Sequence, residues 1–252
     1  MTDSLLLQFT HTGMIADNHK KEYVNSISSF FPLSEDEILF FTQGTSGYKF
    51  IHLKVSSGVF EFKVPIEKEL QGLDFGNDKS MSVFNDRVTI IYPVSQKLER
   101  FNFSLDIIDD VFLDFDQFSI LDSEVKALQN DQNRMFEMIQ NDEEKKAHSF
   151  SVVEIEDYYF LDYYLGSFRQ GDFMKTLINK STGENLSWKS LTIDGVEADL
   201  NLLGTNEKND FVFLFNPEEL EKFTSRQVEL LSESLGISID QNLPLILIMS
   251  PK

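Results

Sequence analysis

The sequence predicts an all-β protein made of several small antiparallel sheets. Much of its length falls in short runs that are rich in aromatic and β-branched side chains and too short for helices. Five of these runs hardly alternate between apolar and polar residues, so we expect both faces of each strand to be covered. Most gaps between successive runs are too short for the helices of a parallel α/β sheet. The five runs are Ile38–Thr42, Val88–Tyr92, Tyr158–Tyr164, Phe211–Phe215 and Leu245–Met249.

Two further segments do alternate, as expected of strands with one face toward the core and one toward solvent. In Val59–Val64, the rings of Phe60 and Phe62 fall on one face, and charged residues fall on the other. Arg100–Phe103 repeats this pattern. A mixture of covered and half-exposed strands is expected where small sheets pack face to face.

Turns recur at a regular spacing, which predicts a repeated structural unit. The intervals from Gly13 to Gly58 and from Gly58 to Asp106 are 45 and 48 residues. The next interval, to Gly183, is 77 residues, and it becomes about 48 when a helical insertion of about 29 residues is removed. A repeat of this size with four strands is typical of one blade of a β-propeller. The turns are Thr10–Gly13, Val55–Gly58, Ser104–Asp106 and Lys180–Gly183.

The turn positions divide the chain into blades of a single propeller domain, residues 1–252. We expect about four to five four-stranded antiparallel blades. The last unit has three predicted strands and therefore an open edge. The blade segments are 5–17, 27–64, 80–115, 150–193 and about 200–249.

Two segments are predicted to be helical insertions. Residues 123–147 lack Gly and Pro, and apolar residues recur there near helical spacing, with a break expected near Asn130–Asn133. Residues 217–236 follow Asn216 as a helix cap, begin with Pro217, and end at Gly236.

Several structural motifs are shared with a known group of proteins. They are Phe30–Leu33 leading into Ile38–Phe41, Val111–Phe115 before the first helical segment, and Leu235–Ile237 with Asn242–Ile248. Over nearly its whole length the chain resembles the six-bladed, TolB-like β-propeller proteins of Bacteroides and related bacteria, and it corresponds to their C-terminal two-thirds. The resemblance implies an incomplete six-bladed ring that lacks N-terminal blades. It also implies a periplasmic or cell-surface protein in its complete form. It supplies no pattern of catalytic residues.

Composition limits the partners and the chemistry. The 42 acidic and 22 basic residues give a net charge of −20, which argues against binding nucleic acid or anionic lipid. The absence of cysteine excludes disulfides, thiolate nucleophiles and Cys-ligated metals. The first ten residues lack the regions of an export signal, and no apolar run is long enough to span a membrane. We therefore expect no membrane insertion.

No metal, cofactor or catalytic site is predicted. The histidines lack metal-ligand spacing on one element. The acidic stretch 106–116 lacks the ligand pattern of a calcium loop, and alternation places Asp110, Asp114 and Asp116 on one solvated strand face. No P-loop, dinucleotide fingerprint or nucleophile elbow is present. The four histidines are His11, His19, His52 and His148.

The richest aromatic segment, residues 157–172, holds the candidate contact site. Its strand, Tyr158–Tyr164, is most simply an inner strand whose rings pack between sheets. The loop Gly166–Gly171 that follows is expected at a blade end, where propeller ligands bind. Tyr and Arg are common at binding hot spots. The candidate ligand-binding residues are Tyr163, Tyr164, Phe168 and Arg169.

These observations predict a non-enzymatic binding or interaction propeller whose ligand is a protein, peptide or glycan. The alternative is a hydrolase or lyase that works at the propeller axis with Asp, Glu, Tyr or His, which would require a pocket holding several titratable groups in perturbed environments. A third hypothesis is a truncated chain with no independent function.

Overall fold

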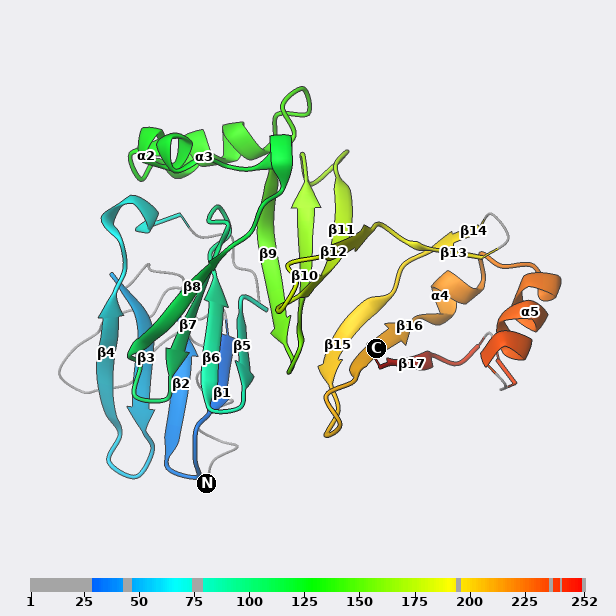
Figure 1. Cartoon of the computed structure of the whole chain (residues 1–252), viewed down its shortest axis with the longest axis horizontal. Coiled ribbons are helices and arrows are strands. Elements are labelled where there is room, and N and C mark those ends of the chain that lie inside the picture. The colour runs from blue at the N-terminus through cyan, green and yellow to red at the C-terminus, as the bar shows by residue number, and fades with distance from the viewer. Residues whose placement is uncertain are drawn as a thin grey trace. The chain divides into compact units, whose positions relative to one another are not determined.

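A computed structural model of the chain describes residues 29–42, 47–73, 79–193, 196–235, 238–240 and 242–250. The chain forms two compact units. Unit 1 comprises residues 1–152 and 162–172, and unit 2 comprises residues 153–161 and 173–252. Figure 1 shows the strands and helices of each unit.

The first sheet of unit 1 is a four-stranded antiparallel meander. Each strand pairs with the next along the chain, so that Phe40 lies opposite Ile51 and Ile51 opposite Phe62. Gly58 has φ +64° in the turn before the last strand, where glycine adopts the left-handed conformation without strain. The strands are β1 (Ser29–Pro32), β2 (Glu37–Phe41), β3 (Tyr48–Lys54) and β4 (Val59–Pro65).

The second sheet of unit 1 repeats this meander. Asn85 and Asp86 both have positive φ and form a two-residue hairpin turn, which suits the twist of the flanking strands. Leu105 takes the positive φ in the predicted glycine-free turn. The strands are β5 (Met81–Phe84), β6 (Arg87–Ile91), β7 (Lys97–Asn102) and β8 (Ile107–Phe112).

The core of unit 1 joins these two sheets to a group of short helices. Leu39 and Phe41 of β2 and Phe50 of β3 belong to one buried cluster with Val88 of β6 and Phe101 of β7. The helices add Leu70, Val125, Leu128 and Met135 to the same cluster. The helices are η1 (Lys68–Leu70), η2 (Asp116–Phe118), α2 (Asp122–Leu128) and α3 (Gln132–Ile139).

A third four-stranded sheet contributes residues to both units. Its order is β12-β11-β10-β9, again a meander of neighbouring antiparallel strands. Gly183, with φ +71°, lies in the predicted turn between its last two strands. The strands are β9 (Ala147–Glu154), β10 (Tyr158–Leu165), β11 (Asp172–Asn179) and β12 (Asn185–Trp188).

Unit 2 also contains a three-stranded sheet and a small hairpin. The sheet has the order β15-β16-β17, and two helices lie between its last two strands in the chain. The helices pack against the sheet through one buried cluster, which comprises Phe215, Leu220, Phe223, Val228 and Leu231. The elements are β13 (Leu191–Ile193), β14 (Val196–Ala198), β15 (Asn201–Thr205), β16 (Phe211–Phe215), α4 (Pro217–Leu220), α5 (Ser225–Leu235) and β17 (Leu245–Met249).

The all-β prediction is confirmed, with four antiparallel sheets of three or four strands and one two-stranded hairpin among the described residues. The segments 27–64, 80–115 and 200–249 each hold one sheet. The predicted helical segment 123–147 holds most of α2 and all of α3, with Asp131 capping α3 inside the expected break, but its helical part ends at Ile139 and β9 begins at Ala147. The arrangement of the sheets around an axis stays a prediction. The segment 5–17 and the turn Thr10–Gly13 lie outside the described residues, as does Gly236.

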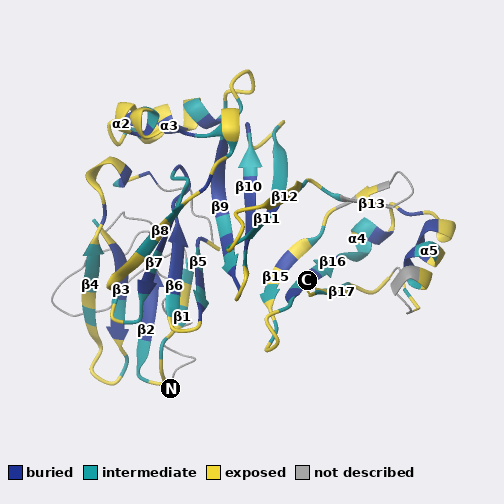
Figure 2. Ribbon diagram, viewed as in Figure 1, coloured by how far each residue is buried: buried dark blue, intermediate teal, exposed yellow. Residues whose placement is uncertain are grey.

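Three expectations were wrong. Leu245–Met249 is an edge strand with one open face, because Ile246 and Ile248 are exposed (Figure 2). Asp114 and Asp116 do not continue a strand face, because β8 ends at Phe112. In the segment 150–193, the last three residues, Leu191–Ile193, pair with β14 in the separate hairpin.

Candidate functional site

The predicted loop brings two of the four candidate residues together with a histidine. Tyr164 at the end of β10 and Phe168 in the loop lie 4.9 Å apart between ring centroids. Both contact His148 of β9, at 6.0 Å for Tyr164 and 5.0 Å for Phe168. Phe168 is exposed on its outer side, so this aromatic trio presents one ring to solvent.

The other two candidates lie elsewhere. Successive residues of a strand point to opposite faces, so Tyr163 faces away from Tyr164. Tyr163 is buried and packs against Phe115 and Phe150, with ring centroids 4.8 and 5.7 Å away. Arg169 is exposed in the loop. The structure therefore places Phe168 and Arg169 at the surface and Tyr163 in the protein interior.

The loop after β10 is held in place by hydrogen bonds and by close packing of its backbone. The backbone N–H of Ser167 donates to Oδ1 of Asp142 at 3.1 Å, and that of Gln170 donates to Oγ of Ser167 at 3.1 Å. A Cβ at Gly171 would lie 2.4 Å from the carbonyl oxygen of Ser167, so only glycine fits there. The positions of Phe168 and Arg169 are thereby fixed by their own loop.

His148 is fully buried and its tautomer is defined by its neighbours. Nε2 donates to the carbonyl oxygen of Gly166 at 2.8 Å, and Nδ1 faces Oγ of Ser149 at 2.9 Å. Burial lowers the pKa of His148, and the hydrogen bond to Gly166 only partly opposes this effect. Within the described ranges, no group of three or more His, Asp or Glu side chains is arranged to hold a metal ion. His11 and His19 lie outside those ranges.

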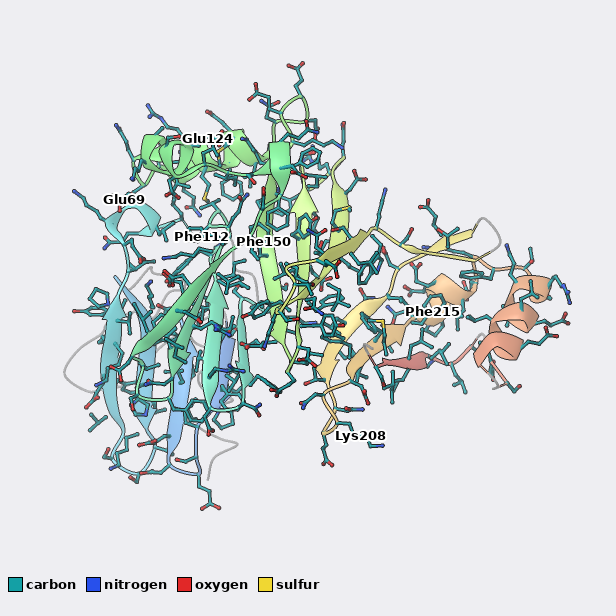
Figure 3. The ribbon with its side chains drawn as sticks, viewed as in Figure 1. Glu69, Phe112, Glu124, Phe150, Lys208 and Phe215 are labelled. Atoms are coloured by element: carbon teal, nitrogen blue, oxygen red, sulfur yellow. The ribbon has the colours of Figure 1, made fainter. Side chains whose placement is uncertain are left out.

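Unit 1 also contains an open pocket of about 660 Å³ that sequence reasoning did not identify. Seven of its sixteen lining residues are apolar, and charged side chains of both signs, Glu69, Asp122 and Lys126 among them, also line it. Figure 3 labels two lining residues, Glu69 and Phe112. Phe112 is 74% exposed. The apolar lining residues are Leu70, Val94, Phe112, Leu113, Ile120, Leu121 and Val125.

One polar atom among the lining residues lacks a partner. Nε2 of Gln96 is buried and makes no hydrogen bond with any described residue. A buried amide donor without an acceptor destabilises a protein by about 1–3 kcal/mol.

Beside the pocket lies a chain of paired charges. Nζ of Lys49 lies 3.0 Å from Glu67 and 2.5 Å from Glu99, and Nζ of Lys97 lies 2.7 Å from Glu99. Lys97 also lies 3.5 Å from Asp110. Glu67 and Lys97 line the pocket, whereas Lys49 and Glu99 are buried beneath.

Burial and pairing compete in setting the pKa values of these groups. For Glu67, burial acts to raise the pKa, but hydrogen bonds from its own backbone and from Lys49, with the nearby lysine charges, lower it overall. For Lys97, burial acts to lower the pKa, but the hydrogen bond to Glu99 and the acidic charges raise it overall. Burial, then the charges of Glu99 and Glu67, raise the pKa of Tyr92 well above its usual range.

The acidic side chains of residues 106–116 form ion pairs and hydrogen bonds with nearby residues. Asp109 forms an ion pair with Arg100, Asp110 pairs with Lys97, and Asp106 accepts from the side chain of Asn102. Asp114 accepts from the backbone N–H of Asp116 at 2.8 Å. These carboxylates are spread along different contacts and do not converge.

The sequence carried one signal of the buried network. Lys49 interrupts the apolar run of β3, and Glu99 interrupts the run of β7, which is unusual for positions expected to face a core. Their partnership could not be read from the chain, because they are 50 positions apart.

No protein-family model matches the chain, and no curated protein matches its sequence. The chain is similar to the crystal structure of a Bacteroides fragilis protein described as a "putative exported protein", with 17% identity and a TM-score of 0.61. The match covers 90% of this chain and 66% of the other, so this chain spans just under two thirds of that protein's length. At this identity the likeness shows the fold alone: an all-β antiparallel architecture shared with a Bacteroides protein. None of the described helices has the length and apolar character that a membrane span requires.

Proposed function

We propose that this protein is a non-enzymatic binding protein with its sheets arranged as blades of a TolB-like β-propeller, and that its ligand is a protein, peptide or glycan. The repeated four-stranded meanders and the likeness to the Bacteroides fragilis structure support the architecture. The "exported" description of that neighbour supports a periplasmic or cell-surface location. The charge of −20 supports a partner other than nucleic acid or anionic lipid.

The observation that carries the proposal is the pocket of unit 1. It combines seven apolar side chains with Nε2 of Gln96, a donor that has no partner among the described residues and would pair with an acceptor oxygen. Peptide carbonyls and sugar hydroxyls both supply that oxygen, and Phe112 offers an exposed ring on which a sugar or an apolar side chain can pack. The loop with Phe168 and Arg169 is the second proposed contact region.

The pocket proposal is tested by screening the labelled protein on peptide and glycan arrays, followed by calorimetric titration of each hit. Gln96→Leu removes the donor, and Phe112→Ala removes the ring; each is expected to weaken a hit by at least about tenfold. Phe30→Ala, an exposed ring on β1 outside the pocket, is the matched control and should bind as the wild type does. Hits that are insensitive to both pocket variants, and to Phe168→Ala and Arg169→Ala, would refute the assignment.

The alternative is a hydrolase or lyase that uses the titratable groups at the pocket wall, Glu67 and Lys97; ion pairing shifts the pKa of each in the direction that keeps it charged. Each array hit is therefore incubated with the protein and analysed by mass spectrometry. We expect every hit to be recovered intact. Cleaved products that are lost in Glu67→Gln would favour the enzyme.

A further inference from the structure

The three-stranded sheet of unit 2 carries no charge. None of its three five-residue strands, β15, β16 and β17, contains Asp, Glu, Lys, Arg or His, although a quarter of the chain is charged. Of the four outer strands of the two unit 1 sheets, β1 and β5 also lack charge, whereas β4 and β8 carry paired charges. On β4, Glu61 pairs with Lys63, and on β8, Asp109 pairs with Arg100. Charged outer strands keep a sheet soluble and discourage pairing with another chain.

One face of this uncharged sheet is buried and the other is open. Phe211 and Phe213 of β16 pack in a cluster with Leu247 and Met249 of β17. On the opposite face Ile246 is 57% exposed and Ile248 is 61% exposed. Single exposed aliphatic residues are normal, and β17 presents two of them on the same strand face.

Within the described part of the chain, one edge of β17 is unpaired. β17 pairs with β16 on one side, and no other described strand pairs with it. Its residues include neither lysine nor proline, which commonly protect natural edges. The pattern Leu245-Ile246-Leu247-Ile248-Met249 has isoleucines placed symmetrically about Leu247. An antiparallel copy centred on Leu247 would therefore set Ile246 of each strand opposite Ile248 of the other.

We propose that β17 is a docking strand for a second copy of this chain, which pairs with it antiparallel about Leu247 to form a six-stranded sheet across the dimer. Two chains of charge −20 repel one another, so they associate best through a surface that carries no charge. The self-complementary spacing of Ile246 and Ile248 selects a copy of the same strand over an unrelated partner. The inference is independent of the pocket in unit 1.

An edge of five residues forms a small interface, below about 1,200 Å², so the dimer is expected to be weak and concentration-dependent. Light scattering coupled to size exclusion, from about 1 µM to about 500 µM, should show the mass rising from that of one 29.1 kDa chain toward two. Added salt should tighten the dimer because it screens the repulsion between the copies.

The matched pair of variants is Ile248→Lys and Ile107→Lys. The two isoleucines are 61% and 62% exposed and both lie on outer strands, β17 and β8. Ile248→Lys is expected to raise the dimer dissociation constant by at least about tenfold. Ile107→Lys should leave it unchanged. A wild type that stays monomeric throughout overturns the proposal, as does equal weakening by both variants.

The register is tested by cysteine pairing, which is unambiguous because the chain has no cysteine. Directly opposite residues on antiparallel strands have Cα atoms about 4.5–5.5 Å apart, which suits a disulfide. A mixture of Ile246→Cys and Ile248→Cys proteins should form a disulfide-linked dimer under mild oxidation. Either protein alone should not, because equivalent residues are then diagonal and about 7–8 Å apart. Crosslinking of either variant alone to the same extent as the mixture contradicts the register.

Discussion

Lys49 of β3 and Glu99 of β7 form a buried ion pair in unit 1: Nζ and Oε2 lie 2.5 Å apart, and both side chains are 2% exposed. The pair is the centre of an alternating row of charges, in which Glu67 flanks Lys49 and Lys97 flanks Glu99. Each buried charge therefore has two partners of opposite sign. Such pairs add little when intact, but removing one member leaves an uncompensated charge in a region of low dielectric.

Glu99→Gln is expected to destabilise the protein by about 3–5 kcal/mol, since it leaves Lys49 buried with only the half-exposed Glu67. The free energy of unfolding is measured by urea titration. Asp110→Asn, at the exposed end of the row, is the control and should cost less than about 1 kcal/mol. Equal effects of the two substitutions would show that the buried pair contributes no more to the free energy of unfolding than the exposed end of the row does.

Tyr92→Phe is expected to leave the protein as stable or to stabilise it by about 1 kcal/mol at pH 7, because the buried Tyr92 hydroxyl has no partner among the described residues. The folded-state pKa of Tyr92 is raised, so its contribution is fully present below its unfolded pKa and is lost as the pH rises above about 10. The stability advantage of the variant should therefore grow above that pH, by at most about 1.4 kcal/mol per pH unit. Urea titrations at pH 7 and pH 11 measure both effects.

His148 is expected to make stability fall in mild acid. Burial lowers its folded-state pKa, so its contribution is present above the unfolded value of about 6.5 and is lost as the pH falls through the folded value. The free energy of unfolding, measured from pH 8 to pH 5, should decrease as the pH falls. Its slope against pH should include the uptake of one extra proton on unfolding, by His148. In His148→Gln that extra slope should vanish. An unchanged slope would mean that other groups cause the decline.

Gly171→Ala is expected to destabilise the protein by about 2 kcal/mol and to move the loop that carries Phe168 and Arg169, since the added Cβ meets backbone atoms at 2.4 to 2.8 Å. Gly58→Ala is the comparison: it has positive φ but open space, so it should cost only about 1 kcal/mol and leave that loop unmoved. Denaturation and the NMR shifts of the amides of residues 166–171 report the two effects separately.

Local patterns predicted the strands of this fold well. Phe211–Phe215 and Leu245–Met249 have the predicted boundaries, and the turn glycines Gly58 and Gly183 have the expected positive φ. These features depend on a few neighbouring residues, which a single sequence displays. The coverage of Leu245–Met249 was mispredicted, because burial depends on which strands come to lie beside it.

The candidate site was predicted less well for the same reason. Tyr163 and Tyr164 are adjacent in an aromatic segment, so both were predicted to belong to one site. Adjacent residues of a strand point to opposite faces, so the two rings have different neighbours. The pocket near Gln96 is assembled from segments between residues 67 and 126, none of which has a motif of its own. Proximity of that kind arises only when the sheets and helices pack.

The position of α4 and α5 in the chain affects how unit 2 folds. Phe215 and Leu245 are partners in the sheet, yet 29 residues lie between them, whereas only five separate β15 from β16. Short loops close faster than long ones, so the β15–β16 hairpin should form first, with the edge Phe211–Phe215 open until β17 arrives. Refolding from denaturant is then a competition between intramolecular docking of β17 and aggregation through that edge. The yield should improve as the protein is diluted further.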